Sequence, residues 1–308
     1  MEIMQDMMQD ARLDGAPART STIRTRDGIL LTIYHWPVPG TQMDGDPLSG
    51  AGTGIARATV ALVHGLAEHA GRYAALAQRL NAAGIELMSV DLRGHGQSPG
   101  KRVWVDQFDQ YLDDAQALVD TAARRGTPLF LMGHSMGGAI VALYAVERLD
   151  ANGAPAKGLI LSSAALAPGR DVPKWMIALS RVISRWMPNF PAMKVDASVL
   201  SRDPAVVEAN RNDPLVHHDP IPARTGAEIL NAMTRITNGR SQLRLPVLVF
   251  HGTADKLTEP EGSREFGAHV GSADRTLTMY EGAYHETMND IDRDRVIDAL
   301  IAWIDARI

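Results

Sequence analysis

The sequence predicts an α/β fold with a mostly parallel central sheet, flanked by helices and interrupted by an inserted helical cap. Short apolar runs alternate with helix-length amphipathic segments from Ala58 onward, which is typical of parallel βαβ units. Between about Ala164 and Ser241 this alternation gives way to helical sequence that contains prolines, methionines and tryptophans. It then resumes, so we expect one sheet core with one cap.

The expected elements follow in chain order. Residues 21–38, STIRTRDGILLTIYHWPV, predict an antiparallel hairpin, and the Gly- and Pro-rich residues 39–57 predict a long loop. Strands are expected at ATVALVHG, IELMSVD, TPLFLMG, AKGLILSS, LPVLVFHG and TLTMYEG, and helices over residues 72–83, 106–125 and 137–149. The predicted division is an N-terminal tail at 1–20, a core at 21–163 and 242–308, and a cap (lid) at 164–241.

Composition excludes several classes of function. With 308 residues, 45% of them hydrophobic, the chain can bury a large core. Its net charge of -5 gives no general attraction to phosphate backbones, so we expect no nucleic-acid partner. The absence of cysteine excludes disulfides, thiolate metal sites and cysteine nucleophiles. No cluster of His, Asp and Glu has metal-ligand spacing, and no GxGxxG motif follows the first strand, so no metal or other cofactor is expected.

The sequence also bears on localisation. Residues 1–20 carry acids among their methionines and lack a basic region before an apolar run, which argues against a signal peptide. No segment has the roughly 18 consecutive apolar residues that a spanning helix needs. We therefore expect a cytoplasmic protein, with peripheral membrane contact as a further expectation. The oligomeric state is left open.

A candidate nucleophile lies in residues 133–137, GHSMG, which match the G-x-S-x-G motif of the α/β-hydrolase nucleophile elbow. The motif alone is weak, but here a predicted strand leads into it and an apolar, helix-periodic segment follows it. This context makes Ser135 the expected nucleophile. The alternative is a glycine-rich turn between a strand and a helix.

A serine nucleophile needs a base, and the base needs a carboxylate that fixes its tautomer. In this fold the acid follows the serine in the chain and the histidine comes last. Asp255 and His285 each follow a predicted strand in that order, so they are the expected acid and base. Structural roles are expected for histidines beside other strand ends, in the cap and on a surface helix: His64, His134, His251, His217, His218 and His269. The loop DLRGHGQSPG, with Asp91, His95 and Ser98, is interpreted as a shaped turn rather than a second site.

Ester hydrolysis also needs donors for the negative charge that develops on the carbonyl oxygen. The backbone N–H of Met136, at the start of the helix after the nucleophile, is one expected donor. The loop after ATVALVHG should supply the other, most simply from Leu66. Each such donor typically contributes ~10²–10³ in rate.

Several motifs together resemble those of the monoacylglycerol lipases. They are, in order, HGLAEHAGRY, DLRGHGQSPG, GHSMGGAI, ASVLSRDPAVVEANRNDPLV, HGTADKLTEP and YEGAYHE, and the resemblance extends from about Ser21 to the C-terminus. It implies a cap that forms an acyl tunnel and docks on membranes, and cofactor-free hydrolysis of a monoacylglycerol to glycerol and a fatty acid. It also implies Ser135, Asp255 and His285 as the triad and Leu66 and Met136 as the oxyanion hole.

The same resemblance implies a glycerol-binding group. Glu68 and Arg72 occupy matching positions, with a structural ion pair in the oxyanion loop as the alternative. Two positions depart from the family pattern, because Asn210 stands where a tyrosine is expected and Met288 where a second histidine is expected. Lysophospholipase and small-ester carboxylesterase activity therefore remain alternatives, and a non-catalytic hydrolase-fold binding protein is a more distant one.

One predicted cap helix has an apolar stripe. Between Pro173 and Pro188 its members follow helical i, i+3, i+4 spacing, with basic residues among the other positions. The stripe comprises Trp175, Met176, Leu179, Val182, Ile183, Trp186 and Met187. Such a helix can lie in a membrane interface, or it can bury the stripe against the core. The sequence leaves both open.

Overall fold

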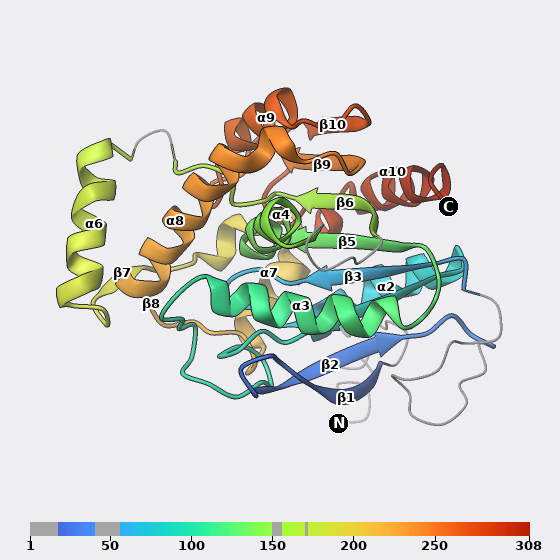
Figure 1. The fold of residues 1–308 in the computed structure, drawn as a ribbon, viewed down its shortest axis with the longest axis horizontal. Coiled ribbons are helices and arrows are strands. Elements are labelled where there is room, and N and C mark those ends of the chain that lie inside the picture. Colours follow the sequence, from blue (N-terminus) through green and yellow to red (C-terminus); the bar gives the residue numbers. More distant parts are fainter. Residues whose placement is uncertain (1–17, 41–55, 150–155, 170–171) are drawn as a thin grey trace, which may run out of the picture.

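The structure, a computed structural model, describes residues 18–40, 56–149, 156–169 and 172–308 (Figure 1). Its centre is a sheet of eight strands. In spatial order these are β1 (Arg19–Arg24), β2 (Leu30–Trp36), β4 (Ile85–Val90), β3 (Ala58–Val63), β5 (Leu129–His134), β6 (Ala156–Ser162), β9 (Val247–Gly252) and β10 (Arg275–Tyr280). β1 pairs antiparallel with β2 and β2 with β4, and the other neighbours are parallel. The mostly parallel sheet with an antiparallel hairpin at its start is therefore confirmed.

The predicted strands are found close to their expected positions because their sequences are apolar runs that the sheet buries on both faces. All residues of β3, β4, β5 and β9 are buried. β1 begins at Arg19, inside the predicted tail. Residues 1–17 of that tail and residues 41–55 of the predicted loop lie outside the described residues.

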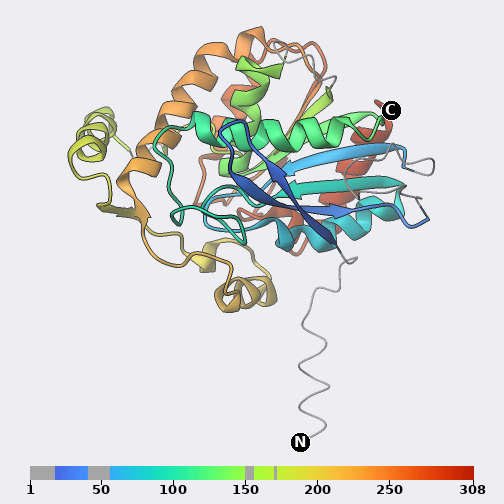
Figure 2. The same cartoon turned by 60° about the horizontal axis from the view of Figure 1, so that its bottom comes forward.

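Helices cover both faces of the sheet (Figure 2). On one face lie α2 (Ala74–Ala82), which follows the short 3-10 helix η1 (Ala70–Tyr73), and α10 (Arg293–Asp305). On the other lie α3 (Asp109–Ala123), α4 (Met136–Glu147) and α9 (Pro260–His269). α4 is almost entirely buried, because it packs between the sheet and a further helix, α8 (Ala223–Gly239). The central position of α4 fixes the residue that precedes it, Ser135.

The predicted cap segment contains α6 (Lys174–Trp186), β7 (Pro191–Met193), η2 (Ala197–Val199), α7 (Pro204–Asn212), β8 (Ile221–Pro222), α8 and η3 (Arg240–Gln242). Its helical character is confirmed, although the small antiparallel β7–β8 pair was not expected. α8 contributes Ile229, Ala232 and Ile236 to the same buried cluster as α4. The last helix of the segment thus belongs to the core layer, and residues 164 and 241 remain predicted cap boundaries.

α6 stands at one end of the molecule and packs against α8 (Figure 1). The alternative in which its apolar stripe is buried is wrong for most of the stripe. Trp175 is 66% exposed, Val182 54% and Trp186 78%. Ile183 is half-buried and faces inward. Among the described helices, none combines the length and the apolar character that crossing a membrane would require.

Candidate active site

Ser135 lies at the sharp turn between β5 and α4. Its φ of 54° and ψ of -120° are strained for a residue with a side chain, and the surrounding glycines make the turn sterically possible. A Cβ on Gly133 would lie 2.2 Å from the carbonyl oxygen of Gly137, and one on Gly137 would lie 2.1 Å from that of Val63. Other parts of the backbone thus pass so close to Gly133 and Gly137 that no side chain fits at either position. The turn places Ser135 on the wall of a large cavity.

Asp255 and His285 come from loops at the ends of β9 and β10 and lie in direct contact. His285 Nδ1 is 2.7 Å from Asp255 Oδ2. The other oxygen, Oδ1, accepts the backbone N–H groups of Leu257 and Thr258 at 2.8 and 3.2 Å. The Thr258 hydroxyl lies 2.8 Å from Oδ2. This bonding fixes the carboxylate and leaves Nε2 of His285 as the ring nitrogen that can take a proton.

The electrostatics suit a general base. Burial alone would lower the pKa of His285, but the charge and hydrogen bond of Asp255 raise it above its usual value of 6.5. Burial would raise the pKa of Asp255, yet His285 and His251 hold it well below its usual range. The ring of His134 lies beneath His285, with centroids 4.7 Å apart. Burial, and then His285, lowers the pKa of His134 to about 4, so the ring stays neutral.

The expected oxyanion donors line the same cavity as the candidate nucleophile. Leu66 and Met136 both line the cavity, and Met136 opens α4, whose N-terminal dipole favours negative charge. Within the described residues, neither backbone N–H donates to another backbone carbonyl. The preceding N–H, of Gly65, is instead taken by Glu68 Oε1 at 2.6 Å. That bond shapes the loop and leaves the N–H groups of Leu66 and Met136 for a ligand.

At one end of the cavity Arg72 joins two buried carboxylates. Arg72 Nη1 lies 2.7 Å from Glu68 Oε2 and 2.7 Å from Glu286 Oε1, and Nη2 lies 2.9 Å from Glu286 Oε2. The Tyr73 hydroxyl donates to Glu68 Oε1 at 2.8 Å. Burial would raise the pKa of both carboxyls, but Arg72 keeps both below their usual range. These contacts support the ion-pair alternative for Glu68 and Arg72, which also line the cavity.

The two positions that depart from the family pattern lie in different places. Asn210, on α7, is 6% exposed and lines the cavity. Met288 is 5% exposed and packs into the apolar cluster with α10, and it is not among the described residues that line the cavity. Met288 is therefore less well placed than Asn210 for contact with a substrate.

Several of the remaining histidines have structural partners. His64 Nε2 accepts the Leu92 N–H at 3.0 Å, and His95 Nδ1 lies 3.0 Å from the Arg93 carbonyl oxygen. In the same loop, Asp91 accepts the N–H groups of Ala70 and Gln97 at 2.8 Å each. The segment DLRGHGQSPG thus forms a hydrogen-bonded turn.

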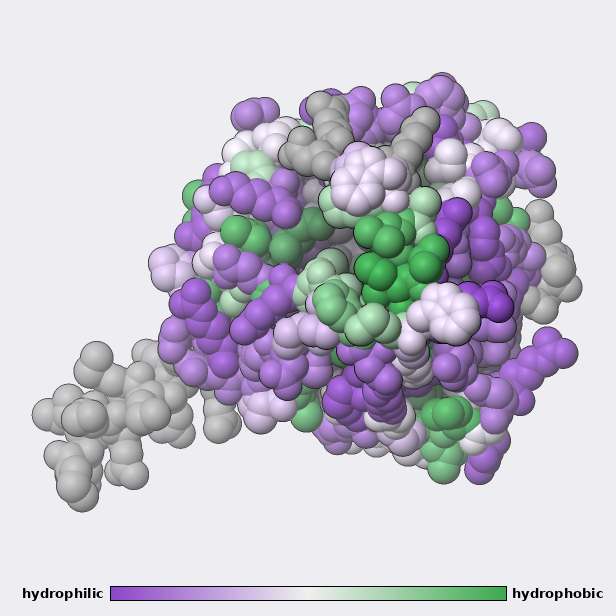
Figure 3. Space-filling model, turned by 90° about the vertical axis from the view of Figure 1, so that its left-hand side faces the viewer, coloured by the Kyte–Doolittle hydropathy of each residue, from purple (hydrophilic) through white to green (hydrophobic). Residues whose placement is uncertain are grey.

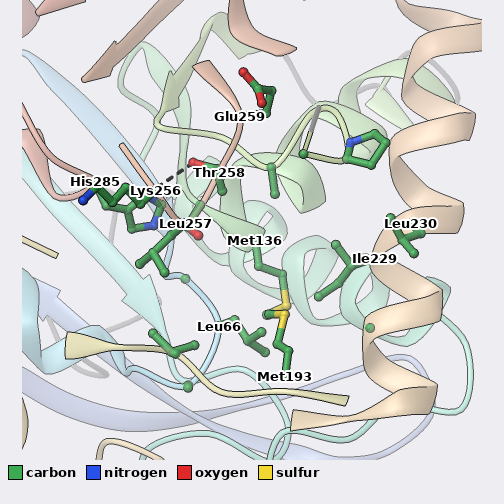
Figure 4. Close-up of a pocket in the computed structure, with 18 of the residues that line it drawn as sticks. Leu66, Met136, Met193, Ile229, Leu230, Lys256, Leu257, Thr258, Glu259 and His285 are labelled. Atoms are coloured by element: carbon green, nitrogen blue, oxygen red, sulfur yellow. Dashed lines mark hydrogen bonds between the residues drawn. The ribbon is translucent and has the colours of Figure 1, made fainter. Parts of the chain in front are cut away.

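The cavity has a volume of about 1230 Å³ and extends from the triad beneath the cap (Figure 4). Its walls are mostly apolar and come from the core and from the cap. The apolar lining includes Leu66, Met136, Met193, Ile229, Leu230 and Leu257. At the cap end, exposed apolar side chains surround the hollowed surface (Figure 3). The site therefore joins the candidate nucleophile to a large apolar volume.

The comparisons with known proteins agree with this geometry. A family model described as "Serine aminopeptidase, S33" matches residues 54–292. A monoacylglycerol lipase of Mycolicibacterium smegmatis is 37% identical over 80% of this chain and 88% of its own length. The rat monoglyceride lipase is 34% identical over 92% of this chain and 89% of its own length. The chain belongs to the monoacylglycerol lipase family.

The crystal structure of the Paleococcus ferrophilus monoacylglycerol lipase superposes with a TM-score of 0.74 at 32% identity, covering 95% of this chain and 100% of that one. The α/β-hydrolase fold and the expectation of a serine hydrolase that cleaves carboxylic esters are thereby confirmed.

The sequence did not predict a part in the site for several residues around the candidate triad. His251 and Thr258 bond to Asp255, and Glu286 pairs with Arg72 beside His285. His251 was interpreted as structural because it lies at a strand end. Glu286 ends the motif YEGAYHE, directly after His285, but no role was predicted for it.

Proposed function

We propose that the protein hydrolyses monoacylglycerols to glycerol and a free fatty acid through an acyl-enzyme. One observation carries the proposal: a single cavity brings Ser135 and His285 together with a large apolar volume and a compact polar end. At about 1230 Å³ it exceeds the ~300–1,000 Å³ of most small-molecule pockets. It therefore has room for a long acyl chain together with a glycerol head group.

The proposed roles follow from the geometry. His285 Nε2 takes the proton of Ser135 as its hydroxyl attacks the ester carbonyl, while Asp255 stabilises the resulting imidazolium. The N–H groups of Leu66 and Met136 bind the oxyanion. His285 then protonates the departing glycerol oxygen and, in the second half of the reaction, activates the water that hydrolyses the acyl-enzyme.

The charge of the polar end favours a neutral head group. Glu68, Glu286 and Arg72 together carry one net negative charge, because two carboxylates face one guanidinium. Arg72 is already bonded to both carboxylates and is poorly available to a phosphate. A lysophospholipid would bring its phosphate towards this negative group at a Coulombic cost. The net charge of Glu68, Glu286 and Arg72 therefore supports a substrate with a glycerol head group rather than a phosphorylated one.

We further propose that the cap collects substrate from a membrane surface. The exposed side chains of Trp175, Val182 and Trp186 on α6 offer apolar area next to the cavity, and Arg181 and Arg185 on the same helix are exposed cations. An amphipathic helix of this kind binds in the interface of anionic bilayers. A water-insoluble monoacylglycerol would then enter the cavity from the lipid phase.

A substrate panel tests the proposed function. Purified protein should turn over 1- and 2-monoacylglycerols of several chain lengths with kcat/KM values well above those for lysophosphatidylcholine, with short nitrophenyl esters as a reference for intrinsic esterase activity. Higher kcat/KM on lysophosphatidylcholine than on monoacylglycerol would assign a lysophospholipase instead. Activity confined to the nitrophenyl esters would assign a small-ester carboxylesterase.

A further inference from the structure

The carboxylate of Asp255 contacts a second imidazole besides that of His285. His251 Nε2 lies 2.9 Å from Asp255 Oδ2, the same oxygen that His285 Nδ1 approaches to 2.7 Å. The side chains of His251 and Asp255 are both 0% exposed. The proposed mechanism uses His285 alone, so His251 is a buried titratable group whose contact with the triad has no assigned role.

A third residue bonds to the other nitrogen of the second ring. His251 Nδ1 lies 2.7 Å from Ser263 Oγ on α9, and Ser263 is also fully buried. An ionised carboxylate can only accept, so the proton of a neutral His251 lies on Nε2. Nδ1 then carries a lone pair that accepts the hydroxyl proton of Ser263. The carboxylate therefore selects the tautomer that donates to it, and the contact from α9 satisfies the remaining ring nitrogen.

The two imidazoles cannot exchange roles. Both ring nitrogens of His251 are engaged, and it is not among the described residues that line the cavity. His285 lines the cavity beside Ser135. His251 is also held on β9, four positions before Asp255, so the strand fixes its distance from the carboxylate.

We propose that His251 is a positioning residue for ester hydrolysis, which holds Asp255 Oδ2 towards His285 and shares its negative charge, while Ser263 on α9 anchors the other nitrogen of the ring. The inference rests on the triad of the proposed function. It adds a second imidazole donor, supplied by β9, to the hydrogen bonds that orient the acid.

Removal of this donor has a defined electrostatic consequence. With His251 present, the negative charge of Oδ2 is divided between two imidazole N–H groups. Without it, more of that charge faces His285 and favours its protonated form. The other charged or titratable groups around His285 remain in place: His134 on β5, Glu68 after β3, neighbouring Glu286, and Arg72 between the two glutamates. The low-pH side of the kcat/KM profile, here called the acid limb, should therefore move to higher pH.

The experiment compares His251→Leu with His251→Gln by pH profiles of kcat/KM on a water-soluble short-chain ester. We expect His251→Leu to lower kcat by about tenfold, as a lost hydrogen bond to a charged group commonly does, and to raise the midpoint of the acid limb by roughly half a pH unit. In His251→Gln the amide N–H can still donate to Asp255, so most of kcat and the wild-type midpoint should return. Histidine NMR should show two imidazole N–H protons bonded to Asp255 in the wild type and one in His251→Gln.

His35 supplies the matched control, because it is another buried histidine bonded to a buried carboxylate. His35 Nε2 lies 3.0 Å from Glu86 Oε2, and both side chains are 0% exposed. His35→Leu should lower the melting temperature and leave the acid limb unchanged. Ser263→Ala retains the imidazole and removes only the hydroxyl that anchors its Nδ1, so it should give a smaller shift in the same direction as His251→Leu.

The outcomes separate the proposals. A folded His251→Leu enzyme with the wild-type acid limb would overturn the positioning role. If His251→Leu does not fold, two other results together would overturn the positioning role. These are a wild-type pH midpoint of kcat/KM in Ser263→Ala and a His251→Gln spectrum that lacks none of the wild-type signals from imidazole N–H protons. Fluorophosphonate labelling of Ser135→Ala tests the triad separately. Labelling at another serine would refute the proposed function whatever the His251 variants show.

Discussion

The core side of the cavity, around Asp255 and Arg72, and its cap side, formed in part by α6, are stabilised by different interactions. On the core side, Asp255 accepts hydrogen bonds from two backbone N–H groups and from several side chains, and Arg72 is bonded to two buried carboxylates. On the cap side, α6 exposes Trp175 and Trp186 to solvent and packs mainly against α8. Charged groups are oriented where the reaction takes place, and apolar area is exposed where substrate would be collected. Substitutions in the two regions should therefore change different measurements.

The largest effect is expected at the nucleophile. Ser135→Ala should lower kcat by about 10⁵-fold or more while the protein stays folded, because the strained turn does not depend on the hydroxyl. His285→Ala should cost about as much, and the double variant should be barely worse, since the two groups act as one unit. Initial rates and melting curves check this. Substantial turnover by Ser135→Ala would show that another group attacks the ester.

The next effect separates the ion-pair role of Arg72 from direct substrate contact. Arg72→Met should lower the free energy of unfolding by about 3–5 kcal/mol, because it leaves Glu68 and Glu286 buried without a counter-charge. The control is Arg79→Met, because Arg79 pairs with Asp294 and Asp298 at the surface, where about 0–1 kcal/mol is expected. Denaturant titrations measure both. A stable Arg72→Met enzyme with a raised KM for monoacylglycerol would favour direct contact instead.

On the cap, Trp186→Glu should weaken binding to anionic vesicles roughly tenfold, since it replaces a membrane-facing aromatic with a like charge. Hydrolysis of dispersed long-chain monoacylglycerol should slow, while the melting temperature and turnover of a soluble short-chain ester stay the same. Ile308→Glu, a charge added to an exposed apolar residue at the opposite end of the molecule, is the control (Figure 1). Equal losses on both substrates would refute membrane docking through α6.

The smallest expected effect is a shift in pH dependence. His285 must be neutral to act as base, and its pKa is raised above 6.5, so kcat/KM should fall as the pH drops through a midpoint above 6.5. Glu286 is among the groups that raise this pKa. Glu286→Gln removes its charge and should move the midpoint to lower pH, by less than about one unit. Glu281→Gln, on the exposed turn before His285, should leave it unchanged. An upward shift in Glu286→Gln would contradict this electrostatic assignment.

Local pattern predicted most of the fold because the core strands are apolar on both faces and the helices are amphipathic. The same pattern identified the candidate triad, since the acid and the base each follow a strand and the nucleophile lies between two required glycines. It did not predict that α8 would join the core layer or that β7 would pair with β8. Those outcomes depend on partners distant in the chain.

The sequence by itself determined the strand order along the chain, the nucleophile elbow and the acid–base pair as candidates, because each depends on short-range spacing. Only the tertiary structure decided which groups surround them. Glu286 meets Arg72 across 214 positions of sequence, and α6 exposes its tryptophans because it contacts α8 rather than the sheet. The periodicity of α6 is the same whether its stripe faces the core or solvent. Its orientation is set by packing, which a one-dimensional pattern does not contain.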